Sequence, residues 1–233
     1  MWLLGKKTVY DRSRILGEAQ QARSRKKYEK AIALYRQVLE VEPENVDLLG
    51  KIAPLLARAR HPAEVRSTYR SAAEGLVRRG FVDRAIGTLR EATGYLPRDV
   101  EIWSALAALE LKRGRPIDAH RTLLQGRSHF RRRKDRPQAI ELLRRARELA
   151  PKDFETSFDL AGLLARSGQR ARAHSLLEEL VRRSGRRELR RVRARQLRVA
   201  PSPAAGWRWL RALLWTDSTP GGEIPGRAQV ARR

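Results

Sequence analysis

The sequence predicts an all-α fold, a solenoid of about ten antiparallel helices followed by a basic C-terminal extension. Three observations predict it: a segment of 54 residues occurs three times without gaps, each copy holds three stretches with helical spacing of apolar residues, and the stretches are joined by two to five residues. Such short connections force consecutive helices to lie antiparallel and side by side. We therefore expect each helix to contact mainly its sequence neighbours.

The three copies span residues 28–81, 82–135 and 136–189. Six positions are identical in all of them: Ala31/Ala85/Ala139, Ile32/Ile86/Ile140, Arg36/Arg90/Arg144, Pro43/Pro97/Pro151, Ala53/Ala107/Ala161 and Leu55/Leu109/Leu163. So many identities at one spacing indicate a unit of construction rather than chance similarity.

Each copy contains start and stop signals for three helices. In the second copy the first helix, residues 83–95, carries apolar residues on one stripe and ends before Pro97, whose ring and missing N–H prevent continuation. The second helix begins behind Asn45, Asp99 or Asp153, residue types that cap helix N-termini. The third follows a glycine- or proline-containing break. The pattern predicts the same three-helix order in every copy.

The spacing of small and large residues resembles the tetratricopeptide repeat. Its A-x3-F-x7-P pattern occurs three times: Ala31-x3-Tyr35-x7-Pro43, Ala85-x3-Leu89-x7-Pro97 and Ala139-x3-Leu143-x7-Pro151. The resemblance covers residues 12 to 184 and implies a right-handed α-solenoid that acts in protein–protein interaction. The chain departs from the family pattern in the interval between successive small residues of the motif, which alternates between 34 and 20 residues. The third helix of each copy therefore closes one helix pair and also opens the next. Which helix face is concave is therefore left open.

These signals divide the chain into five segments. Residues 1–27 are expected to hold the first, capping helix and 28–189 the solenoid, followed by a basic helix extension at 190–200, a proline-hinged tryptophan-rich amphipathic segment at 201–215 and a disordered tail at 216–233. The tail contains too little apolar surface to pack.

Net charge is the largest anomaly of the composition. The chain carries 51 Lys and Arg against 26 Asp and Glu, a formal charge of +25, which attracts polyanions without choosing among them. It contains no cysteine, and its N-terminus lacks the apolar run of a signal peptide. No apolar run approaches the roughly 20 residues that span a bilayer. We expect a soluble cytoplasmic protein.

No constellation of catalytic residues is present in the sequence. It has four histidines and lacks the G-x-x-x-x-G-K-[ST], G-x-S-x-G and H-E-x-x-H motifs. His120 and His174 lie one repeat apart, which repeat geometry explains better than metal binding. We therefore expect no enzyme activity, no cofactor and no metal site.

Recognition is the remaining class of function, and the resemblance implies a groove lined by the second helix of each copy. The candidate partner-binding residues are Asp47, Arg58, Glu101, Ser104, Lys112, Glu155, Phe158 and Arg166. Among them Arg58, Lys112 and Arg166 form a basic column at 54-residue spacing, which favours an acidic peptide or a chain carboxylate. The alternative is that these cations complement the negative C-terminal ends of their helices. The Arg36/Arg90/Arg144 column is expected to form salt bridges or to pack beside the core.

The C-terminal segments support two alternative functions. The arginine run ending at Arg198 suits contact with nucleic acid or anionic lipid, and it also suits a solvated helix extension. Tryptophan and arginine in the segment 206–215 suit a membrane interface, whereas docking as a cap on the last solenoid helix is the structural alternative. The candidate contact residues are Arg190, Arg191, Arg193, Arg195, Arg198, Trp207, Trp209 and Trp215. The primary hypothesis is a scaffold that binds a peptide or an acidic protein partner; polyanion binding and peripheral membrane association are the alternatives.

Overall fold

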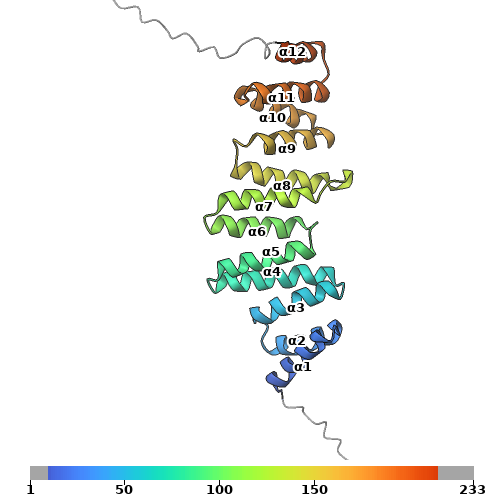
Figure 1. The fold of residues 1–233 in the computed structure, drawn as a ribbon, viewed down its shortest axis with the longest axis vertical. Helices are drawn as coiled ribbons and strands as arrows, with labels where there is room; N and C mark the ends of the chain where they lie inside the picture. The colour runs from blue at the N-terminus through green and yellow to red at the C-terminus, as the bar shows by residue number, and fades with distance from the viewer. Residues whose placement is uncertain (1–9, 215–233) are drawn as a thin grey trace, which may run out of the picture. The chain divides into compact units, whose positions relative to one another are not determined.

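The computed structural model describes residues 10–214, and within that range every regular element is helical (Figure 1). The chain divides into two compact units, Met1–Leu149 and Ala150–Arg233. The predicted all-α class is confirmed. Trp215 and the predicted tail at 216–233 lie outside the described residues.

The first unit is a stack of consecutive helices. Its elements are α1 (Arg12–Ser24), α2 (Tyr28–Val41), α3 (Val46–Arg58), α4 (Pro62–Arg78), α5 (Val82–Tyr95), α6 (Val100–Lys112), α7 (Pro116–Ser128), the 3₁₀ turn η1 (Arg133–Asp135) and α8 (Arg136–Leu149). Each helix contacts the next, and α3 also contacts α5 as α6 contacts α8. The contacts are thus local in sequence, as expected of a repeat protein.

Up to residue 214, where the described residues end, the second unit repeats this arrangement with four helices: α9 (Phe154–Arg166), α10 (Arg170–Arg183), α11 (Arg186–Val199) and α12 (Pro203–Leu214). Consecutive helices contact one another, and α9 also contacts α11. The arginine run folds as α11, which buries Val192, Gln196 and Val199. One face of this strongly basic helix is therefore packed rather than solvated.

The predicted caps are the reason that three helices begin where they do. The Asn45 side chain accepts a hydrogen bond from the backbone N–H of Leu48, and Asp153 accepts one from Thr156. Asp99 accepts from the backbone N–H groups of Glu101 and Ile102 at 3.0 and 3.3 Å. Each cap satisfies donors that the first helical turn leaves without an intrahelical partner.

The residues of the repeat motif form the packed seam of the stack. The small residue is fully buried in every copy: Ala31, Ala85 and Ala139 are all 0% exposed. Tyr35, Leu89 and Leu143, four positions later, are buried as well. In the third helix of each copy the small residues Val65, Ala119 and Ala173 and the large residues four positions later, Tyr69, Leu123 and Leu177, are also buried. Because helix axes approach within about 8–10 Å only where side chains are short, the alanines set the spacing and the large residues fill the gaps.

The repeated arginine column forms ion pairs in two of its three copies. Arg36 pairs with Glu64, and Arg90 pairs with Glu110 at 3.0 Å. The predicted salt-bridge role is confirmed at these two positions, whereas Arg144 has no such partner within residues 10–214. The two pairs differ in burial, since Glu110 is almost fully buried while Glu64 is about half exposed.

Candidate functional site

The first unit contains a groove of about 610 Å³ between α4 and α6. Leu89 of α5 lies at its base, and Arg145 of α8 borders it. Because the three helices follow one another in the stack, α5 sets the separation of α4 and α6 and leaves a channel between them.

Apolar side chains make up most of the groove surface. They are Ala73 and Val77 of α4, Leu89 of α5 and Ala105, Ala108 and Leu109 of α6. Ala108 is exposed and Val77, Ala105 and Leu109 are half-buried, so this apolar surface is open to solvent. The volume is within the range of about 300–1,000 Å³ typical of ligand pockets.

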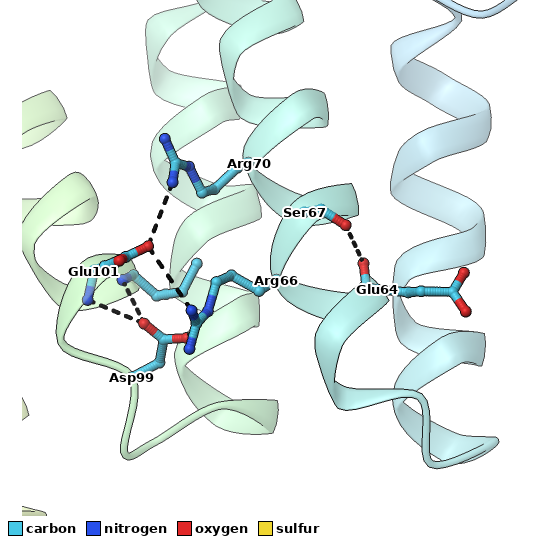
Figure 2. A network of polar contacts seen from close by, with 7 residues as sticks. Glu64, Arg66, Ser67, Arg70, Asp99 and Glu101 are labelled. Carbon is cyan, nitrogen blue, oxygen red and sulfur yellow. Dashed lines mark hydrogen bonds and ion pairs between the residues drawn. The ribbon is translucent and has the colours of Figure 1, made fainter.

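Charged residues border the apolar surface: Arg70, Glu74, Arg78, Glu101 and Arg145. The Nη1 atom of Arg70 lies 3.3 Å from Glu101 Oε2, and Arg66 pairs with the helix cap Asp99 and reaches Glu101 at 4.0 Å. Figure 2 shows Arg66 and Arg70, both on α4, directed toward Asp99 and Glu101 at the start of α6. This network joins the two walls of the groove at one end.

Ser104 is the polar group inside the groove. Its Oγ atom is buried and has no hydrogen-bond partner among the described residues. Buried polar groups in proteins are nearly always paired, so this hydroxyl is an exception among the described residues.

The structure distributes the other predicted groove residues of the first unit over the surface. Asp47 pairs with Arg84 at 2.8 Å, and the guanidinium of Arg58 lies 5.7 Å from the centre of the Tyr28 ring. The interaction with Tyr28 raises the pKa of Arg58. Lys112 is exposed in the last turn of α6. Of the predicted set, Glu101 and Ser104 line the groove.

In the second unit, predicted groove and tail residues contact one another. Arg191 of α11 pairs with Glu155 of α9 at 2.9 Å and lies 4.7 Å from the centre of the Phe158 ring. This hydrogen-bonded pairing lowers the pKa of Glu155 and raises the pKa of Arg191. Phe158 is thus covered by α11 and is 8% exposed.

The other arginines and tryptophans that were proposed to contact an anion or a membrane differ in burial and in hydrogen bonding. Arg193 donates to the Gln196 amide oxygen at 2.8 Å, and its partial burial lowers its pKa. Arg190 is half-buried and Arg198 is exposed on α11. On α12, Trp207 is 66% exposed and Trp209 is half-buried.

The groove residues that sequence reasoning missed are the apolar ones on α4 and α6. The signal that could have found them is the run of small residues at Ala105, Ala107 and Ala108. Because Ala107 is buried in the stack while Ala105 and Ala108 face the groove, composition alone does not separate the two roles.

Comparison with known protein families agrees with this geometry. Two tetratricopeptide-repeat family models match the chain, one over residues 70–119 and the other over residues 130–195. Both matches are to tetratricopeptide repeats, and together they support a helical repeat protein of this type. The first match includes most of the residues that line the groove. Repeats of this family generally form non-catalytic scaffolds for protein–protein interaction.

Several solved structures are similar to this chain at low sequence identity. The crystal structure of MamA is 16% identical, covering 85% of this chain and 94% of that chain with a TM-score of 0.33. A tetratricopeptide repeat protein from Parabacteroides merdae is 12% identical (87% and 98% covered, TM-score 0.26). Pseudomonas aeruginosa pilF is 16% identical (88% and 90% covered, TM-score 0.29). No curated protein matches the sequence.

Residues 10–214 contain no group of three or more His, Asp or Glu side chains placed to hold a metal ion. None of the described helices combines the length and apolar character that crossing a membrane requires.

Proposed function

We propose that this scaffold binds a partner protein by receiving one of its segments in the groove between α4 and α6. The partner segment carries one or two apolar side chains flanked by acidic residues. The open apolar surface of Val77, Ala105 and Ala108 is the observation that carries the proposal, because exposed apolar area in a concave position gains free energy when it is covered.

The preference for acidic flanks follows from charge. The chain carries +25, and the groove border contributes Arg70, Arg78 and Arg145 against Glu74 and Glu101. An acidic segment is attracted to such a surface over long range, whereas a basic one is repelled. The border arginines already have carboxylate partners, so we expect this charge to act mainly on the association rate.

The first experiment asks which class of molecule binds. The full chain is used to capture ligands from a lysate of its source cells at about 150 mM salt, where exposed charges more than about 8 Å apart are largely screened. Protein partners that remain bound at this salt concentration are expected. Recovery of nucleic acid and no protein would contradict the scaffold and support polyanion binding instead.

The second experiment localises the captured partner to the groove. Ala108→Glu introduces a carboxylate on the apolar surface at an exposed position, so the fold is expected to persist while affinity for an acidic partner segment falls by about tenfold or more. Ile117→Glu is the matched control, because Ile117 of α7 is 73% exposed and lies outside the groove. Equal loss of binding in both variants would place the interface elsewhere.

A second candidate function rests on α12. Trp207, Leu210 and Leu214 share one face of this helix and are all exposed, and Arg208 and Arg211 lie between them in sequence. A short helix with tryptophan, leucine and arginine is suited to the interface of an anionic membrane.

Vesicle flotation tests this candidate. We expect the full chain to float with vesicles that contain an anionic lipid and a Trp207→Ser/Leu210→Ser variant to float at least about fivefold less, because burial of each large apolar side chain contributes about 1.5–3 kcal/mol. Val41→Ser/Phe81→Ser, which removes two exposed apolar residues of the first unit, is the control. Flotation of the α12 variant equal to that of the unchanged chain would rule out this role.

A further inference from the structure

The second unit contains a pocket that has no part in the proposed groove. It measures about 310 Å³ and lies where α9, the start of α10 and the end of α11 meet. Its lining is Gly162, Ala165, Arg166, Arg170, Arg195, Arg198 and Val199. Four of these seven residues are arginines, and none of the lining residues in the described part of the chain is acidic.

Arg195 is held in a defined position at this pocket. Its guanidinium lies 3.6 Å from the centre of the Phe158 ring and donates through Nη1 to the backbone carbonyl of Phe158. Gly162 leaves the space for it, because a Cβ atom there would lie 2.6 Å from Nη1. The group is therefore placed by stacking, hydrogen bonding and backbone clearance before any ligand binds.

Positive charge is concentrated in the pocket. Burial lowers the pKa of Arg195, and the nearby charges of Arg166, Arg191 and Arg198 act in the same direction against the opposing effect of Asp159. Arg170 and Arg198 form no ion pair with any residue between 10 and 214. Bringing like charges together costs free energy, which an anion bound among them would recover.

We infer that this pocket binds a small molecule that carries a diphosphate group. Guanidinium groups present planar pairs of N–H donors that match phosphate oxygens, so arginine is the residue suited to this ligand. Arg170, Arg195 and Arg198 alone carry more positive charge than one orthophosphate dianion neutralises. The pocket volume is at the lower end of that of small-molecule sites. Ala165 and Val199 provide an apolar wall for an organic group attached to the diphosphate.

Calorimetric titration of the full chain tests the ligand class. Inorganic pyrophosphate, orthophosphate and sulfate are titrated separately at about 150 mM salt, where nonspecific attraction to the basic surface is screened. We expect one pyrophosphate per chain, bound about tenfold or more tightly than either smaller anion. Equal affinities for the three anions, or many weak sites, would show general Coulombic attraction and overturn the proposal.

Variants then test the location. Arg170→Gln and Arg198→Gln are each expected to weaken pyrophosphate binding by about tenfold or more, since each removes a charge-assisted hydrogen bond. Arg172→Gln and Arg187→Gln remove the same charge from α10 and α11 outside the pocket, and they should leave the affinity within about twofold. If these controls weaken binding as much as the pocket variants, the pocket is not the site.

Gly162→Ala provides an independent check that leaves every charge in place. The added methyl group meets the flexible end of Arg195, so this guanidinium is displaced while the helix is kept. Weaker pyrophosphate binding with an unchanged helical circular dichroism signal is expected. Unchanged affinity in this variant would remove Arg195 from the site and with it the proposed binding geometry.

Discussion

Replacing Arg90 by methionine is expected to lower the free energy of unfolding by about 3 kcal/mol. Arg90 of α5 provides the cation for Glu110 of α6, whose side chain is 2% exposed and also accepts a hydrogen bond from Thr122 at 2.7 Å. Without Arg90, a buried carboxylate keeps one hydroxyl donor and no countercharge. Urea denaturation followed by circular dichroism measures the loss.

Two matched variants distinguish the buried charge from general effects of losing an arginine. Arg36→Met removes the residue at the same repeat position, but its partner Glu64 is about half exposed, so we expect a loss below about 1 kcal/mol. Glu110→Gln in the Arg90→Met background should restore a large part of the stability, because the neutral amide no longer needs a countercharge. Equal losses for Arg36→Met and Arg90→Met would contradict this explanation.

Replacing Gly126 by valine is expected to cost about 3 kcal/mol of stability. Gly126 of α7 lies against Trp103 of α6 so closely that a Cβ atom would be 2.6 Å from the indole Cγ atom. Trp103 has little freedom to move away, because it is buried, donates from Nε1 to the Pro97 carbonyl at 2.9 Å and stacks on His129. The close approach of α6 and α7 therefore depends on glycine at this position.

The repeat itself supplies the control for this prediction. At the positions aligned with Trp103 and Gly126, the first copy has Leu49 and Ala72. The double variant Trp103→Leu/Gly126→Ala copies that pair and should lose less than about 1.5 kcal/mol, since it exchanges volume between the two sites. Gly87→Ala, on an exposed face of α5 with no atom within 4 Å of the added methyl group, should stabilise by about 0.5–1 kcal/mol. Tolerance of Gly126→Val would show that the two helices separate without cost.

Periodic features of the fold could be predicted from the sequence. The helix caps at Asn45, Asp99 and Asp153 and the buried seam of alanines followed four residues later by large side chains are confirmed by the structure. These features depend on residues close together in the chain, and three copies at one spacing distinguish them from chance.

The groove could be predicted only in part. The sequence predicts Glu101 and Ser104, because they lie on a helix to which the family resemblance assigns the groove face. It does not predict Val77 of α4 and Arg145 of α8, because a helix shared between two pairs has two faces in contact with neighbours and the repeat pattern does not say which face stays open. That choice depends on the separation of α4 and α6, which the packing of α5 sets.

By itself the sequence determined the repeating helical unit, its helix boundaries and the residues of its packed seam, because these depend on local periodicity and steric rules. The tertiary structure alone decided the surroundings of the long charged side chains. Arg191 and Arg195 belong to one run of arginines, yet Arg191 pairs with Glu155, whereas Arg195 stacks on Phe158 beside Gly162 and borders the basic pocket. A flexible arginine reaches several ångströms from its helix, so its partners depend on which residues the neighbouring helix presents.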